Sequence, residues 1–265
     1  MRVPILLILF ALSLLPIPAC AQDELRVAAA ADTQFVLPQI VAAFEQRTGK
    51  KIGTSFGSSG NLSAQIQSGA PFDVFLSADT AYAQKLVDGG FAPADSLYKY
   101  AEGKLVLWVP ANSQLDPSLG LNLLLAPEVK RIAIANPQHA PYGRAAVAAL
   151  EKSGVYGAIT PKLVLGENVS QAFQFVSSGN ANIALLSLSF AKAPGANGKY
   201  WLIPENLYPA IEQSAVVLKN SSHRAAAYAF LAFLRTPEAK MLLQKSGLAP
   251  QPLLLPSAPA IGEKP

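Results

Sequence analysis

Four loops in the sequence have the composition of a binding site for a small anion. They combine small residues, hydroxyl groups and accessible backbone, none of them contains Lys or Arg, and they span residues 28–33, 57–61, 136–143 and 166–170. Backbone N–H groups in the first turn of a helix have no partner within the helix, and the helix dipole adds partial positive charge there. Taken singly, Ser and Asn at helix starts serve most often as caps. Several helix starts that converge can hold an anion through neutral donors alone.

The segments around these loops alternate between strand and helix patterns. Residues 25–30, 73–77 and 104–109 are short, mostly apolar runs typical of strands, whereas residues 33–48 have apolar positions at helical spacing and end before Gly49. This alternation predicts parallel sheets with helices on both faces. Ligands of such sheets bind beyond the carboxyl ends of the strands, where the four loops would meet.

The bulk composition narrows the class of protein. The chain has 265 residues, of which 51% are hydrophobic and 14% charged, and this length suits two compact lobes. The net charge is +4, but the basic residues are scattered and form no stripe interleaved with aromatic residues. A nucleic-acid partner is therefore not expected.

The N-terminus predicts export. Arg2 precedes an apolar stretch over residues 3–17, which is too short to span a bilayer comfortably and is followed by small residues. We predict a signal peptide over residues 1–21 and a periplasmic protein, with Cys20 as a lipid anchor in the alternative interpretation. Cys20 is the only cysteine, so the exported chain has no disulfide and no cysteine-based catalytic or metal site.

The sequence gives little support for catalysis. His139 and His223 are the only histidines, and neither accompanies a nucleophile-elbow pattern or zinc-ligand spacing. His139 lies in a candidate loop, where we expect it to pack near the site rather than act as a base. We therefore predict that the protein is not an enzyme and uses no cofactor.

Five stretches resemble the periplasmic molybdate-binding proteins of molybdate ABC importers, and the likeness covers nearly the whole mature chain. They are VAAAAD, FGSSGNLSAQIQSGAPFDVFLSAD, YAEGKLVLW, IAIANPQHAPYG and VLGENVSQAF. The resemblance implies an α/β, two-lobed clamp of the type II periplasmic-binding-protein family, each lobe a mainly parallel sheet flanked by helices. It also implies capture of molybdate or tungstate between the lobes and delivery to an ABC permease.

The resemblance sets the expected domains. Lobe I would hold residues 24–102 plus 205–253, lobe II residues 103–204, and residues 254–265 would form a loose tail. We expect a monomer that docks onto the membrane permease in its closed form.

The resemblance also implies the residues that contact the oxyanion. Ser59 would bind through its hydroxyl and amide, and Tyr142 and Val169 mainly through backbone N–H groups. Molybdenum would be bound only as the oxyanion, through the same residues. The full expected set is Ala31, Asp32, Ser59, Tyr142 and Val169, with Ser58, Gly60, Ser170 and Ser187 as additional candidates.

Asp32 departs from the family pattern, because many members carry Ser, Thr or Asn in the first loop. An ionised carboxylate facing a dianion would be repulsive. We therefore predict that Asp32 is a helix N-cap that turns its charge away and offers its backbone N–H. In the alternative, Asp32 is protonated or accepts a proton from the ligand, which would favour hydrogen phosphate.

Other ligands fit the loops less well. Ferric-ion capture proteins of this architecture use tyrosine pairs, and amino-acid binders use an Arg for the carboxylate. Neither pattern occurs in the candidate loops, since Arg144 already lies inside a predicted helix. Phosphate and sulfate stay open as alternatives, because both are tetrahedral anions.

Overall fold

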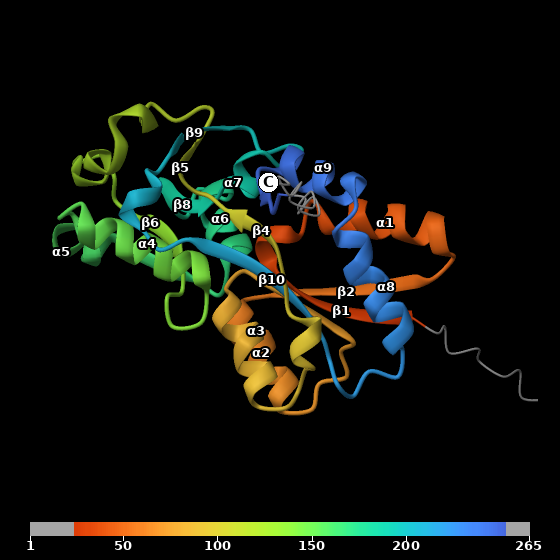
Figure 1. Ribbon diagram of the computed structural model, residues 1–265. Coiled ribbons are helices and arrows are strands. Elements are labelled where there is room, and N and C mark those ends of the chain that lie inside the picture. Colours follow the sequence, from red (N-terminus) through yellow and green to blue (C-terminus); the bar gives the residue numbers. More distant parts are fainter. Residues whose placement is uncertain (1–23, 253–265) are drawn as a thin grey trace, which may run out of the picture.

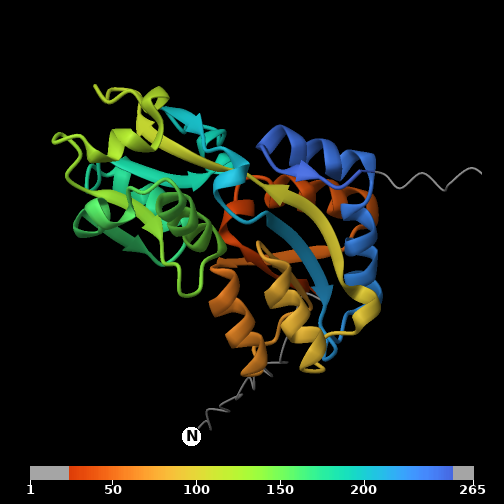
Figure 2. The same ribbon diagram turned by 60° about the vertical axis from the view of Figure 1, so that its left-hand side comes forward.

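Two lobes, each built on a β-sheet flanked by helices, make up the computed structural model of the protein (Figures 1 and 2). The structure describes residues 24–252. The predicted signal peptide, Cys20 and the predicted tail over residues 254–265 lie outside the described residues. Within residues 24–252, no helix combines the length and the apolar character needed to cross a membrane.

The first lobe contains a six-stranded sheet with the strand order β11-β4-β10-β3-β1-β2. Its strands are β1 (Glu24–Ala30), β2 (Lys51–Gly57), β3 (Val74–Ser77), β4 (Tyr98–Gly103), β10 (Ile211–Val217) and β11 (Ala249–Pro250). Its helices are α1 (Leu37–Thr48), α2 (Ser59–Gln67), α3 (Thr80–Asp88), α8 (Arg224–Leu234) and α9 (Pro237–Ser246), with 3-10 turns at Ala31–Thr33 and Ala94–Ser96.

The second lobe contains a five-stranded sheet with the order β7-β6-β8-β5-β9. Its strands are β5 (Leu105–Pro110), β6 (Ile132–Ala135), β7 (Leu163–Gly166), β8 (Ile183–Ser187) and β9 (Gly198–Leu202). Its helices are α4 (Pro141–Lys152), α5 (Tyr156–Ile159), α6 (Val169–Ser177) and α7 (Leu188–Ala191), with 3-10 segments at Pro117–Leu125 and Thr160–Lys162. A further 3-10 turn, Glu205–Leu207, lies on the return path to the first lobe.

Strand β1 shows how the first sheet is covered on both faces. Val27 and Ala29 belong to the core formed with α1, α8 and α9, whereas Ala28 belongs to the core formed with α2 and α3. Successive strand residues point to opposite faces, so a strand covered on both sides must be apolar throughout. Figure 1 shows the two helical layers on either side of the sheet. This packing fixes the end of β1 at the boundary with the second lobe.

The two-lobed α/β fold is confirmed, and both sheets are mixed rather than mainly parallel. β1 pairs in parallel with β2 and β3, and β6 with β7 and β8. β10 runs antiparallel to β3 and β4, and β5 runs antiparallel to β8 and β9. β5 and β10 are the strands by which the chain leaves the junction of the lobes. They must therefore run antiparallel to the strands that lead into the junction.

The chain crosses between the lobes at two neighbouring places. It passes from β4 to β5 through Lys104, and it returns to the first sheet between Leu202 at the end of β9 and Ile211 at the start of β10. The crossings are tied together, because the Leu105 amide donates to the Tyr208 hydroxyl over 3.1 Å. Two adjacent crossings of this kind suit a hinge.

Candidate functional site

The four predicted loops meet at one small cavity between the lobes. All five residues of the expected oxyanion set line it, and so does Ser58. The lining from the first lobe is Ala30, Ala31, Asp32, Gly57, Ser58, Ser59 and Ala78, and that from the second is Ala140, Pro141, Tyr142, Asn168 and Val169. Asp32 is the only residue with a charge-bearing side chain in this lining, within the part of the chain that the structure describes.

Ser59 is placed to donate from both its amide and its hydroxyl. It is the first residue of α2, is fully buried, and lines the cavity. Its Oγ accepts a hydrogen bond from the Ala78 amide over 2.9 Å. Because that bond occupies an Oγ lone pair, the hydroxyl hydrogen is left to donate elsewhere.

Val169 and Tyr142 present backbone amides from the second lobe. Val169 is the first residue of α6, and the side chain of its N-cap, Asn168, accepts from the next two amides rather than from that of Val169. Tyr142 follows Pro141, which occupies the first position of α4 and has no N–H. The amides of Val169 and Tyr142 are therefore first-turn donors at the cavity.

Ser58 and Gly60 bring the two lobes together. The Ser58 hydroxyl caps α2 and lies 2.9 Å from His139 Nδ1 and 3.3 Å from a Glu167 carboxylate oxygen. The Gly60 amide donates to the His139 carbonyl over 2.9 Å, and a Cβ on Gly60 would lie 2.7 Å from that oxygen. Glycine at position 60 therefore permits close approach by the loop of the opposite lobe.

Three of the four additional candidates, Gly60, Ser170 and Ser187, lie outside the cavity lining. Ser170 is at the outer rim, and its amide is bound by Asn168. Ser187 is buried behind the cavity and shares a 2.8 Å hydrogen bond with Ser189, whose hydroxyl donates to the Asp32 carbonyl over 2.6 Å. Ser187 is therefore linked to the cavity only indirectly, through Ser189 and the backbone of Asp32.

The prediction that Asp32 is an N-cap is wrong. It lies inside the 3-10 turn Ala31–Thr33, whose N-cap is Ala30, and no side chain caps that turn. The carboxylate instead accepts two hydrogen bonds on Oδ2, from the Tyr142 hydroxyl over 3.1 Å and from Gln213 Nε2 over 2.6 Å. These partners lie far from Asp32 in sequence, and they outcompete a local cap.

Burial dominates the electrostatics of Asp32. Its side chain is 1% exposed, and desolvation raises the pKa of its carboxyl group from 3.8 to about 7, against the lowering effect of the Tyr142 and Gln213 bonds. Within residues 24–252, Oδ1 is buried without a hydrogen-bond partner. A buried oxygen left in this way requires an explanation.

Three residues of this network were missed by the sequence analysis. Gln213 on β10 bonds to Asp32, and the Tyr100 hydroxyl donates to Gln213 Oε1 over 3.0 Å. Gly103, at the end of β4, leaves room for the Tyr142 hydroxyl, which would lie 2.1 Å from a Cβ at that position. No local pattern marks these residues, because their roles depend on the way the lobes meet.

The rim of the cavity carries further contacts between the lobes. Arg144 on α4 forms an ion pair with Asp79, and its guanidinium lies 5.1 Å from the ring centre of Tyr82. Asn61 and His139 both contact Glu167, with His139 Nε2 3.5 Å from its carboxylate. These contacts hold the two lobes against each other at the rim, and His139 packs beside the cavity through its contact with Ser58.

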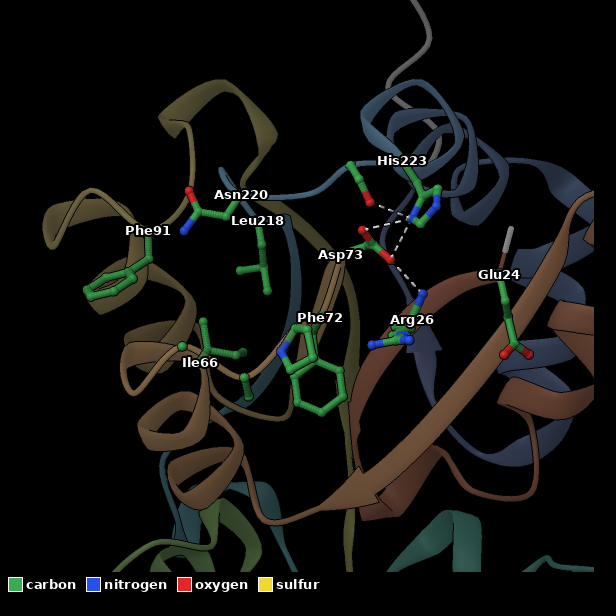
Figure 3. A pocket seen from close by; sticks show the side chains of 13 residues that line it. Glu24, Arg26, Ile66, Phe72, Asp73, Phe91, Leu218, Asn220 and His223 are labelled. Carbon is green, nitrogen blue, oxygen red and sulfur yellow. Dashed lines mark hydrogen bonds and ion pairs between the residues drawn. The ribbon is translucent and has the colours of Figure 1, made fainter. Parts of the chain in front are cut away.

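His223 lies at a larger cavity in the first lobe, at the opposite end of the sheet from the site. There it contacts Asp73, whose Oδ2 also accepts from the Arg26 amide over 2.7 Å (Figure 3). Among residues 24–252, no group of three or more His, Cys, Asp or Glu side chains is arranged to hold a metal ion. The first-turn amides of Tyr142 and Val169 lie instead at the cavity between the lobes.

Comparisons with known proteins agree with a two-lobed solute-binding clamp. The family model described as bacterial extracellular solute-binding protein matches residues 25–249, and the chain belongs to this family. The chain is 41% identical to the molybdate-binding protein ModA of Rhodobacter capsulatus, over 88% of this chain and 90% of that protein. It is 40% identical to ModA of Azotobacter vinelandii, over 86% and 92%. The solved periplasmic molybdate-binding protein of Azotobacter vinelandii superposes with a TM-score of 0.79 at 36% identity, covering 86% of this chain and 99% of that one.

Proposed function

We propose that the protein captures molybdate or tungstate between its lobes and delivers the oxyanion to the permease of an ABC importer. The observation that carries this proposal is the convergence of first-turn amides from both lobes on one cavity whose lining includes no Lys or Arg among the described residues. The identity of 40–41% with two molybdate-binding proteins supports the choice of ligand.

The proposed contacts come from Ala31, Asp32, Ser59, Tyr142 and Val169. Hydrogen bonds to a charged partner contribute about 1.5–3 kcal/mol each, so five to seven such bonds exceed the cost of association for a tight ligand. Neutral donors suit an anion that carries no proton of its own, because every oxygen of such an anion accepts.

Closure couples binding to delivery. Each lobe supplies part of the donor set, so the oxyanion interacts fully only with the closed form and shifts the population towards it. The contacts of Ser58, Gly60 and Arg144 across the rim would stabilise the same closed form. We propose that the closed monomer docks onto the permease and catalyses no reaction. Residues 1–21 would direct export, with a lipid anchor at Cys20 as the alternative.

Hydrogen phosphate is the second candidate ligand. One observation favours it: Asp32 lines the cavity, and an ionised carboxylate there would accept the proton of that anion. The relatives named as molybdate-binding proteins weigh against phosphate.

Isothermal titration of the ligand-stripped mature protein tests the proposal. Molybdate, tungstate, sulfate and phosphate are titrated separately at pH 7. We expect tight one-to-one binding of molybdate and tungstate and none of sulfate or phosphate. Binding of phosphate or sulfate alone would contradict the choice of ligand but would still agree with capture of an anion between the two lobes.

A further inference from the structure

Asp32 raises a chemical problem for an anion site. It is 1% exposed and lines the cavity proposed to hold a dianion. An ionised carboxylate beside a dianion is repulsive, and the repulsion is strong where water is excluded. Either the carboxyl group is kept away from the ligand or it is not ionised when the ligand is bound.

The hydrogen bonds of Asp32 distinguish its two oxygens. Oδ2 accepts from the Tyr142 hydroxyl and from Gln213 Nε2. The orientation of the Gln213 amide is fixed from behind, because its Oε1 accepts from the Tyr100 hydroxyl. In the protonated form of such a group, the oxygen that accepts from two donors is the carbonyl oxygen. A proton on Asp32 therefore belongs on Oδ1, the buried atom for which residues 24–252 supply no partner.

The groups packed around Asp32 favour the neutral acid. Two tyrosines interact with Asp32, Tyr142 on α4 and Tyr100 on β4, and burial raises the pKa of each hydroxyl well above its usual value, so both stay neutral. Ser189 on α7 contacts Asp32 through an uncharged hydroxyl. His139 and Glu167 are titratable but contact Ser58 instead. With burial opposing ionisation, the pKa of Asp32 is about 7 before any anion is present.

We propose that Asp32 binds the oxyanion as a carboxylic acid, with its proton on Oδ1 donated to an oxyanion oxygen. This inference rests on the proposed function of the cavity. A fully deprotonated dianion then enters the clamp together with one proton taken from solvent. The one bond that forms is the O–H bond of the acid: the carboxylate takes up one proton from solvent, and the acid then donates one hydrogen bond to the dianion, which keeps its charge.

The proton balance depends on the ligand. A dianion such as molybdate brings no proton, so Asp32 takes one from solvent. Hydrogen phosphate brings its own proton and can donate it to ionised Asp32, with no uptake from solvent.

A bound dianion further favours the protonated acid, so the pKa of Asp32 rises when molybdate binds. Molybdate binding therefore takes up a proton at pH values between the pKa of Asp32 in the empty protein and its higher pKa in the loaded clamp. As pH rises through this interval, the affinity for molybdate falls, by up to roughly tenfold per pH unit.

Calorimetry with molybdate in two buffers tests this inference directly. At pH 8, titrations in buffers of different ionisation enthalpy give the number of protons bound per molybdate. We expect uptake approaching one proton for the unaltered protein, and uptake near zero with retained binding for Asp32→Asn. The affinity of Asp32→Asn should also vary little between pH 6 and pH 9.

The control addresses the other titratable pair at the rim. Glu167→Gln removes the carboxylate that faces His139 and should leave the proton uptake near one. Molybdate binding with no uptake by the unaltered protein would overturn the inference alone, and so would uptake that persists in Asp32→Asn or is abolished by Glu167→Gln. Failure of molybdate to bind the unaltered protein would overturn the proposed function and the inference together. Absence of proton uptake by the unaltered protein would overturn the inference even if a variant fails to fold.

Discussion

The first lobe holds two buried aspartates at opposite ends of one sheet, and their hydrogen bonds differ. Asp73 is 4% exposed and has partners on both oxygens: Oδ1 accepts from the Ser221 hydroxyl over 2.6 Å, Oδ2 accepts from the Arg26 amide, and His223 Nδ1 lies 3.2 Å from each. Figure 3 shows the contacts of Asp73 with Arg26 and His223. Asp32, at the cavity, accepts hydrogen bonds on Oδ2 alone, and among the described residues its Oδ1 has no hydrogen-bond partner. Buried polar groups are normally paired. This difference supports the proposal that Asp32 keeps one oxygen for a ligand, whereas Asp73 stabilises the fold.

The same substitution at both aspartates should separate these roles, with the largest effect on stability at Asp73. Asp73→Asn replaces one accepting oxygen with a donor beside groups that already donate, and we expect the free energy of unfolding to fall by about 2 kcal/mol. Asp32→Asn keeps the accepting oxygen and should cost less than about 0.5 kcal/mol. Urea unfolding of the ligand-free proteins measures both. Equal losses would remove the distinction between the two sites.

Two buried serines extend the comparison to ligand binding. Ser59→Ala removes a donor at the cavity, and we expect the affinity for molybdate to fall roughly tenfold to a hundredfold. Ser221→Ala, at the other end of the sheet, should lower stability by about 1 kcal/mol and leave the affinity of the folded protein unchanged. Titration calorimetry gives the affinities. A loss of affinity in Ser221→Ala would mean that the two ends of the sheet are coupled.

Gly103→Ala tests whether the network behind Asp32 needs its present geometry. The added Cβ would meet the Tyr142 hydroxyl, which must then move away from Asp32. We expect the affinity for molybdate to fall by about fivefold to tenfold, on the order of 1 kcal/mol. Gly157→Ala is the matched control, because a Cβ there meets nothing within 4 Å. Unchanged affinity in Gly103→Ala would show that the Tyr142 bond is dispensable.

The smallest effect is expected at the rim. Arg144→Gln removes the ion pair with Asp79 across the lobes, which is partly exposed. Exposed pairs contribute up to about 1 kcal/mol, so the affinity should fall about twofold to threefold, and less at high salt. Lys99→Gln breaks an ion pair within the first lobe, with Glu212, and should not change the affinity. Comparable losses from both variants would argue against a rim that stabilises closure.

The sequence predicted the parts of the site that depend on local structure. The loops around Ala31, Ser59, Tyr142 and Val169 are set by strand ends and helix starts, and all four line the cavity. The direction of the Asp32 side chain was not predictable, because it is decided by Gln213, which lies 181 residues away in sequence. The antiparallel direction of β5 and β10 was missed for a similar reason. It follows from the double crossing between lobes, which no single segment encodes.

A crystal structure of the mature protein grown with molybdate, with the metal located by its anomalous scattering, tests the central claim most directly. We predict one molybdenum position in the cavity between the lobes. Its oxygens should lie within hydrogen-bond distance of the Ser59 hydroxyl, the amides of Tyr142 and Val169, and Asp32 Oδ1. Molybdenum found beside His223 at the far end of the sheet, or in the cavity but with Asp32 Oδ1 turned away from it, would contradict the account.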